Sequence, residues 1–254
     1  MKGIHITDIT VEATRDIINQ ESIVMLPIGG GSKSHGNHLP MGTDYFVTDW
    51  IAKRVTEKFE LICLPTLAYA HFPAFVDWPG SVSVEADNFI QFVKDILLSF
   101  VRFGVKKFVI LDGGITTRPP MMILATTMNN DYGVKVAVTN IAGLGKEVQD
   151  EVCEQERGTH GDEAETSCML HINSSLVLMG KAVEEYSPIL PGSYLGDIEK
   201  VYVPVRLNTP TGTNGNSRLA TAQKGERILN AMVDDLLVFL NSYKEARFID
   251  SQKS

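Results

Sequence analysis

The chain has 254 residues, of which 44% are hydrophobic and 21% charged, so it can bury a core and is not a disordered tail. Its formal charge is −8, from 23 basic and 31 acidic residues, and this sign disfavours nucleic acid and anionic membrane surfaces as partners. The cysteines Cys63, Cys153 and Cys168 lie far apart and fit neither a disulfide framework nor a CxxC metal motif. The start of the chain has no signal-like apolar segment, and no run approaches the roughly 20 apolar residues of a membrane span. We therefore expect a cytoplasmic protein, outside the membrane, with one domain over residues 1–254.

Short apolar runs rich in β-branched residues alternate with longer amphipathic segments along the chain. We expect strands at Ile23–Ile28, Leu61–Thr66, Lys107–Leu111 and Lys135–Asn140, and helices near Asp44–Lys58, Glu85–Phe103, Pro119–Asp131 and Arg218–Lys244. The segment Glu85–Phe103 is the clearest helix, because its apolar residues recur at helical spacing. The alternation predicts an α/β fold, a mostly parallel sheet flanked by helices.

Each of the first three predicted strands leads into a polar or glycine-rich loop. These loops are Gly29–Ser32, Ala68–His71 and Asp112–Gly114. Because the carboxyl ends of parallel strands form the ligand crevice of open α/β sheets, we expect the three loops to converge on one site. The proline- and glycine-rich segment Pro188–Asn216 is expected to form an ordered rim, with an edge strand at Val201–Leu207.

The loop after the first strand carries His35, His38 and Asp44 within ten residues. Its glycines would let a phosphate approach the backbone, but the loop has neither a GxGxxG nor a phosphate-loop Gly-Lys-Ser/Thr motif. Imidazole and carboxylate groups suit a divalent metal. The spacing alone leaves an alternative, in which the histidines hydrogen-bond the loop and Asp44 caps the next helix.

A second polar cluster contains His160, Asp162, Glu163 and Glu165. A histidine followed by acids at the start of a helix is a reasonable set for metal binding and proton transfer. The alternative is structural, because acids in a first helical turn interact with the positive helix end and Glu165 would serve as a buried acceptor.

Taken together, these motifs resemble those of the creatininase (creatinine amidohydrolase) family. Lys33–Asp44 resembles that family's E-Q-H-G-P-H-L-P-x-G-T-D, and His160–Ser167 resembles its H-A-G-E-x-E-T-S. Leu219–Gly225 is similar to its late A-T-A-x-x-G, and Phe75–Ser81 to its F-x-G-T segment. Since the motifs occur in the family's order across nearly the whole chain, the sequence is identified as a member, which implies a creatininase-like fold.

The resemblance implies a site for two divalent ions bridged by the aspartate that matches Asp44. One ion is completed by a glutamate and a histidine at the positions of Lys33 and Gly114, and neither residue offers a metal ligand. The other ion keeps His35, Asp44 and, as we infer, Glu163. The resemblance therefore implies one divalent ion, zinc or manganese, held by these three residues.

The resemblance also implies roles for the remaining polar residues. We expect the ammonium of Lys33 to replace the missing ion beside Asp44 and to stabilise a developing oxyanion. His160 is expected to shuttle protons. Glu165 is expected to orient the neighbouring groups without binding the ion itself. The alternative is that Lys33 extends into solvent and the metal site is defunct.

The implied function is a metal-dependent hydrolase acting on a small molecule, a cyclic amide or a related small polar ring. Creatinine itself is disfavoured because the third loop departs most from the family pattern, and a lactam or a cyclic ketone is the nearer variant. The alternative is a non-catalytic protein that binds small molecules or regulates. The resemblance further implies a homo-oligomer, a hexamer.

Overall fold

Two almost wholly apolar strands form the centre of the sheet. In the computed structural model, which describes residues 2–139, 141–188 and 209–247, β2 (Ile23–Ile28) pairs in parallel with β4 (Lys107–Asp112) along its whole length. Every residue of β2 is buried. A strand that is covered on both faces needs such an unbroken apolar run.

The five-stranded sheet has the order β1-β3-β2-β4-β5, and all its pairs are parallel. Its remaining strands are β1 (Ile4–His5), β3 (Ile62–Cys63) and β5 (Lys135–Val138). A separate antiparallel pair joins β6 (Glu184–Glu185) to β7 (Gly215–Asn216). The prediction of an α/β fold with a mostly parallel sheet is confirmed.

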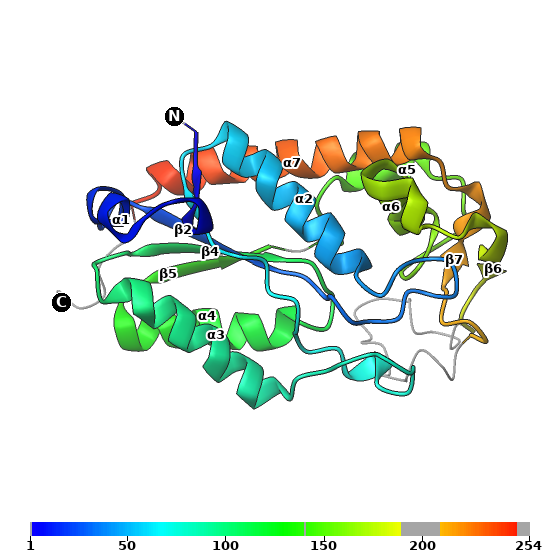
Figure 1. The fold of residues 1–254 in the computed structure, drawn as a ribbon, viewed down its shortest axis with the longest axis horizontal. Helices are drawn as coiled ribbons and strands as arrows, with labels where there is room; N and C mark the ends of the chain where they lie inside the picture. Colours follow the sequence, from blue (N-terminus) through cyan, green and yellow to red (C-terminus); the bar gives the residue numbers. More distant parts are fainter. Residues whose placement is uncertain (1, 140, 189–208, 248–254) are drawn as a thin grey trace.

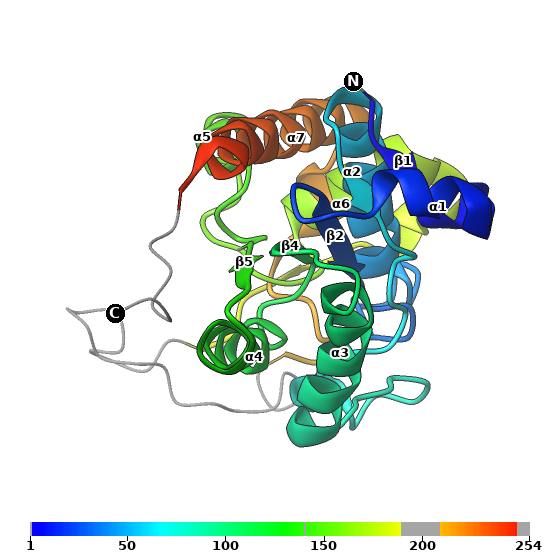
Figure 2. The same ribbon diagram turned by 90° about the vertical axis from the view of Figure 1, so that its left-hand side faces the viewer.

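Helices cover both faces of the sheet and produce three layers (Figures 1 and 2). One face carries α2 (Thr43–Lys58), α6 (Glu163–Asn173) and α7 (Ala222–Glu245), and the other carries α3 (Ala86–Val101) and α4 (Arg118–Tyr132). The shorter helices are α1 (Val11–Ile17), α5 (Lys146–Val152) and the 3-10 turns Ile6–Asp8, Pro73–Phe75, Ser174–Leu176, Met179–Lys181 and Ser217–Leu219.

Alternate residues of the central strands build two separate cores. Met25 of β2 and Val109 of β4 pack under α2 and α7, whereas Val24 and Ile110 pack against α3 and α4. This is the two-residue period of a strand buried on both sides. None of the helices in the described ranges is long and apolar enough to cross a membrane.

The predicted strands and helices are present, with shifted ends. The strand expected at Leu61–Thr66 is only Ile62–Cys63, because Pro65 has no N–H for a sheet ladder. The last helix begins at Ala222, where the Thr221 side chain accepts a hydrogen bond from the backbone of Lys224 as its N-cap.

Two expectations fall partly outside the described residues. The strand that was predicted at Lys135–Asn140 ends at Val138. Its predicted last residue, Asn140, lies outside the described residues. Most of the expected rim, Pro188–Asn216, and the whole of its strand Val201–Leu207 also lie outside the described residues.

The three glycine-rich or polar loops meet at the carboxyl edge of the sheet, as predicted. The Gly31 N–H donates to the Ala68 carbonyl at 2.8 Å, and the Gly113 N–H donates to the Ile28 carbonyl at 2.8 Å. A side chain at Gly113 would collide with the Thr48 hydroxyl and this Ile28 carbonyl, so the close approach requires glycine. These contacts hold the three loops together at one edge of the sheet.

Candidate functional site

A buried ion pair lies at this edge of the sheet. Lys33 Nζ is 2.5 Å from Asp44 Oδ2, and both residues are 5% exposed. The ammonium also lies 4.8 Å from the centroids of the Phe72 and Phe75 rings. Lys33 therefore does not extend into solvent, and the alternative expectation that it would do so is wrong.

Asp44 is placed by the start of α2. It lies in the first turn, whereas the N-cap position is Gly42, so Asp44 does not cap the helix. Burial acts to raise the pKa of Asp44, but the charge of Lys33 and the adjacent ring of His35 together hold this pKa well below its usual range. Asp44 is therefore an ionised carboxylate at neutral pH.

His35 is held in place by a neighbour on each of its ring nitrogens. Its Nδ1 is 3.0 Å from the carbonyl oxygen of Lys33, which can only accept, so Nδ1 carries the hydrogen. Its Nε2 lies 2.6 Å from Asp44 Oδ1. In the neutral ring this nitrogen presents a lone pair to a carboxylate oxygen, and two acceptors at this distance need a proton or another cation between them.

His160 repeats this arrangement. Its Nε2 lies 2.7 Å from the carbonyl oxygen of Ser34 and therefore donates, which leaves the Nδ1 lone pair facing Glu165 Oε2 at 3.9 Å. Burial, and then the nearby charges of His35 and Lys33, lower the pKa of His160 well below its ordinary value, so the ring is neutral. The His35 and His160 rings lie 4.6 Å apart, centroid to centroid.

Glu165 completes the cluster from the first turn of α6. Its Oε2 accepts a 2.5 Å hydrogen bond from the Gly161 N–H, and burial raises its pKa to about 7. Ligand atoms of His35, His160 and Glu165 all lie within 4.8 Å of one another. The structure thus brings together Lys33, Asp44 and these three residues.

Glu163 lies elsewhere, in contrast to the sequence prediction. Its Oε2 accepts from the backbone N–H groups of Glu154 at 2.9 Å and Gln155 at 2.8 Å, and its Oε1 is 2.5 Å from Lys224 Nζ. The reason is helical geometry: α6 begins at Glu163, and residues two apart on a helix point in nearly opposite directions. Glu163 therefore faces α7, and Glu165 faces the histidines.

Two further positions considered in the sequence analysis, His38 and Gly114, are packed against neighbouring side chains. His38 Nε2 is 2.8 Å from the Thr166 hydroxyl, and burial lowers the pKa of His38 to about 4. At Gly114, an added Cβ would lie 2.8 Å from the Phe72 ring and 2.8 Å from Thr117 Oγ1. The third loop therefore has no room for a larger side chain unless Phe72 moves.

Sequence reasoning did not identify Lys224 as the partner of Glu163, nor Phe72 and Phe75 as the walls around Lys33. The lysine of the late motif was the available signal for the first, because the resemblance had singled out that motif without giving the lysine a role. The aromatic pair gave no signal, since its proximity to Lys33 depends on the fold.

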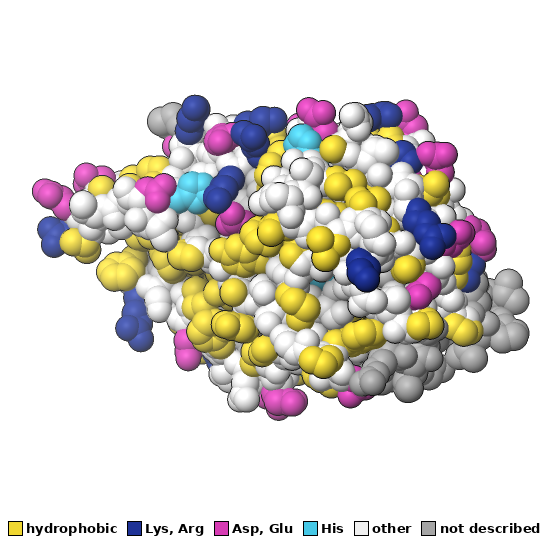
Figure 3. Space-filling model, turned by 45° about the vertical axis from the view of Figure 1, so that its right-hand side comes forward, with side chains coloured by type: hydrophobic (Ala, Val, Ile, Leu, Met, Phe, Trp, Pro, Cys, Tyr) yellow, Lys and Arg dark blue, Asp and Glu magenta, His cyan; other side chains and the backbone are white. Residues whose placement is uncertain are grey.

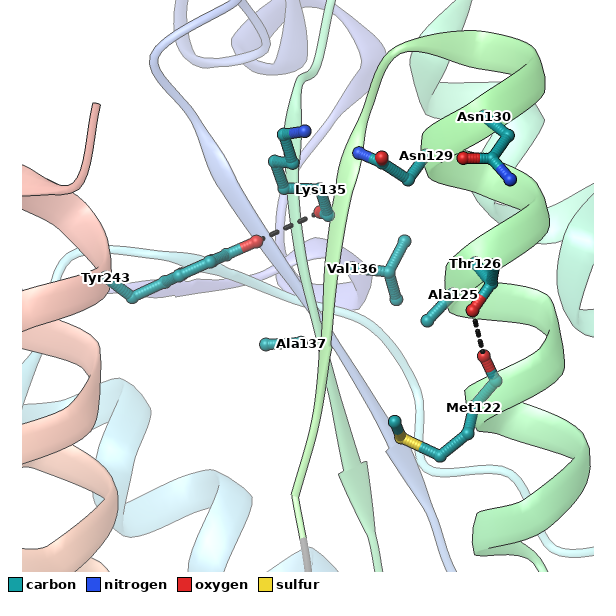
Figure 4. Close-up of a pocket in the computed structure, with 9 residues that line it drawn as sticks. All are labelled: Met122, Ala125, Thr126, Asn129, Asn130, Lys135, Val136, Ala137 and Tyr243. Carbon is teal, nitrogen blue, oxygen red and sulfur yellow. Dashed lines mark hydrogen bonds between the residues drawn. The ribbon is translucent and has the colours of Figure 1, made fainter. Parts of the chain in front are cut away.

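A groove of about 350 Å³ lies between α4, β5 and the end of α7 (Figure 4). It is lined by Met122, Ala125, Thr126, Asn129, Asn130, Lys135, Val136, Ala137 and Tyr243. The Tyr243 hydroxyl donates to the Lys135 carbonyl oxygen at 3.0 Å. None of the residues of the histidine–carboxylate cluster lines this groove, so it is a separate feature.

The fold and the site define an α/β protein with a buried histidine–carboxylate cluster at the carboxyl edge of a parallel sheet. A family model described as creatininase, creatinine amidohydrolase, matches residues 7–240. The chain belongs to the creatininase family of hydrolases.

Curated relatives carry different activities in their names. The chain is 24% identical to a 3-dehydro-scyllo-inosose hydrolase from Thermotoga maritima, with 92% of this chain and 81% of the relative covered. It is 24% identical to a creatinine amidohydrolase from Pseudomonas putida, with 85% and 87% covered. It is 23% identical to a mycofactocin precursor peptide peptidase from Mycobacterium ulcerans, with 84% and 82% covered.

Solved structures share the fold. One described as a creatinine amidohydrolase from Bacteroides fragilis superposes with a TM-score of 0.81 at 22% identity, covering 98% of this chain and 99% of that one. A creatininase described as the Mn form superposes with a TM-score of 0.78 at 22% identity, covering 96% and 100%.

Proposed function

We propose that the protein is a metal-dependent hydrolase that opens a small polar ring, either a cyclic amide or a related lactam or cyclic ketone. The observation that carries the proposal is the cluster of two buried histidines, His35 and His160, with the half-buried Glu165, beside Asp44, in a chain of a hydrolase family. The named relatives hydrolyse unlike substrates at nearly equal identity, so none of their substrates is favoured.

The residues of this chain fit one metal ion and not two. Creatininase structures exist in Mn and Zn–Zn forms. Here the Lys33 ammonium occupies one side of Asp44, and Gly114 offers no ligand and packs against Phe72, which an imidazole ring there would have to displace. The two histidines, in contrast, each donate one N–H to a backbone carbonyl and direct the other ring nitrogen at a carboxylate oxygen. We therefore propose one divalent ion, zinc or manganese.

When bound, such an ion lowers the pKa of a water molecule towards about 7, which makes hydroxide available at neutral pH. The chain orients the site in advance, because the backbone carbonyls of Lys33 and Ser34 hold both histidine rings. The Lys33 ammonium lies 4.8 Å from the centroids of two aromatic rings, and in our proposal its charge stabilises the negative charge that develops on the ring carbonyl oxygen. A well-placed donor of this kind contributes about 3–4 kcal/mol to catalysis.

The alternative function is a non-catalytic protein that binds or senses a small molecule. The observation that favours it is the Lys33–Asp44 pair itself, because the ammonium already neutralises the buried carboxylate without an ion. The two functions differ in metal content and in turnover.

We also propose that the protein is a cytoplasmic homo-oligomer, a hexamer. Its support is family membership and the absence of paired cysteines among Cys63, Cys153 and Cys168. Nucleic acid is not proposed as a partner: the face drawn in Figure 3 carries interspersed acidic and basic side chains, and the net charge is −8. Sedimentation velocity that gave only a 28.0 kDa species would contradict the oligomer.

The test of function is turnover of a panel of lactams, cyclic ureas and cyclic ketones by the zinc- or manganese-loaded protein, with ring opening followed by mass spectrometry. We expect the metal-loaded parent to open the ring of one of these classes. The metal-stripped parent and the His35→Ala variant should open none of them. A fully loaded parent that binds panel members without opening them would favour the non-catalytic alternative.

A further inference from the structure

The arrangement of the two histidines indicates where a metal ion is held. His35 and His160 each donate one N–H to the carbonyl of a neighbouring loop residue, Lys33 and Ser34 respectively. Each directs its other nitrogen at a carboxylate oxygen, His35 at Asp44 and His160 at Glu165. Metal-binding histidines are typically oriented by such a backbone hydrogen bond on the distal nitrogen.

The spacing and chemistry of the cluster suit zinc or a similar ion. Ligand atoms of His35, His160 and Glu165 lie within 4.8 Å of one another, compared with about 3.3 Å between ligands around a tetrahedral zinc ion with bonds of about 2.0–2.2 Å. The Glu165 side chain is 32% exposed, whereas the histidine rings are buried, so Glu165 is the ligand that would move to close this distance. Two imidazoles and one carboxylate are a common zinc set that leaves a position for water.

Glu163 is unsuited to this role. Both its carboxylate oxygens are already used, by two backbone N–H groups and by Lys224, and its residue is 0% exposed. Recruiting Glu163 would leave the Lys224 ammonium without its buried partner.

The charges around the cluster favour one ion. Asp44 is neutralised by Lys33, and Glu165 carries one negative charge when ionised. A divalent ion there leaves one net positive charge, which suits a ligand that becomes anionic, such as the oxygen of a ring carbonyl under attack. A second divalent ion would face the Lys33 ammonium at close range.

We infer that a single divalent ion is ligated by His35, His160 and Glu165, with Asp44 and Lys33 adjoining it as a charge-balanced pair. This set differs from His35, Asp44 and Glu163, which the family resemblance implies. It also makes His160 and Glu165 ligands, where the sequence suggested a proton shuttle and an orienting group. The inference rests on the metal dependence of the proposed function.

The test compares matched variants of the full chain for binding of Co²⁺, a probe with visible absorption in sites with nitrogen and oxygen ligands. Chelator-stripped protein is titrated with Co²⁺, and stoichiometry and affinity are read from absorption and calorimetry. The ligand variants are Glu165→Gln and His160→Gln, and their controls are Glu163→Gln, two residues away, and His38→Gln, a buried histidine that contacts Thr166 instead.

We expect one Co²⁺ per parent chain, a loss of affinity of about 100-fold or more in Glu165→Gln and His160→Gln, and a change below about 3-fold in both controls. Loss in Glu163→Gln with retention in Glu165→Gln would overturn the inference, as would two ions per chain. Circular dichroism checks that each variant folds. If Glu163→Gln does not fold, the comparison of His160→Gln with its control His38→Gln tests the ligand set.

The outcome also separates this inference from the proposed function. Co²⁺ bound as expected without any ring opening would refute the hydrolase and leave the ligand set standing. Ring opening by a protein whose ion depends on Glu163 would refute the ligand set and leave the hydrolase standing.

Discussion

Replacing Lys33 by methionine tests whether its ammonium takes the place of a metal ion. Methionine keeps the length of the side chain and its contact with Phe72 and Phe75, but removes the charge beside Asp44. We expect the metal-free variant to be less stable than the metal-free parent, and to recover more stability than the parent when a divalent ion is added.

The size of the effect follows from the geometry. Opposite charges 2.5 Å apart attract by about 7 kcal/mol at an effective dielectric constant of about 20, and the cost of burying both groups offsets much of this. Removing one partner of a buried pair leaves the other uncompensated, which costs about 3–5 kcal/mol. Saturation with an ion at about 100 times its Kd would return about 2.7 kcal/mol.

Urea unfolding with chelator and with zinc or manganese measures both quantities. Lys33→Glu extends the series: it restores the acid of the family motif without the histidine replaced by Gly114, so repulsion from Asp44 should destabilise its metal-free form further. If the metal-free Lys33→Met and Lys33→Glu proteins were as stable as the parent, Lys33 would not be compensating for an ion.

Four further predictions concern the site and the core. His35→Ala should abolish metal binding, seen as loss of metal by elemental analysis after dialysis, and retained metal would contradict the ligand assignment. Glu163→Gln should cost about 3 kcal/mol in urea unfolding, because Lys224 loses a buried partner, and an unchanged midpoint would refute that role. Phe89→Ala should cost about 3–5 kcal/mol, since Phe89 is 0% exposed in the core under α3; a loss below 1 kcal/mol would not fit. Burial raises the pKa of Asp112 from 3.8 to about 7, so the folded state holds a proton that the unfolded state releases, and the associated stability is lost as pH rises from about 4 to 7. Asp112→Asn should therefore be more stable than the parent at pH 8 by a few kcal/mol, with a flatter pH profile; equal profiles would contradict the raised pKa.

The fold was largely predictable because its signals are local. The apolar run Ile23–Ile28 has only one stable environment, the centre of a sheet covered on both faces, and the helical spacing from Phe89 to Val101 defines α3 within a few residues. Strand ends were less predictable. The strand after Leu61 ends at Cys63, since backbone pairing, not apolarity, determines the length of a strand.

The site was predictable as a group of motifs, but not in its detailed contacts. Motif order indicated that Lys33 replaces an acid near Asp44. The choice between Glu163 and Glu165 depends on where α6 begins and on Lys224, which lies 61 residues further along the chain. The direction of a side chain on a short helix and its partner on a distant helix depend on the tertiary structure. The spacing of residues in the sequence does not determine them.

A crystal structure of the metal-loaded protein, with anomalous diffraction collected at the zinc or manganese edge, would locate the ion and identify its ligands. We predict one anomalous peak per chain, within bonding distance of His35, His160 and Glu165, while the Lys33 ammonium remains beside Asp44. Two peaks, or a single peak bonded to Glu163, would contradict it.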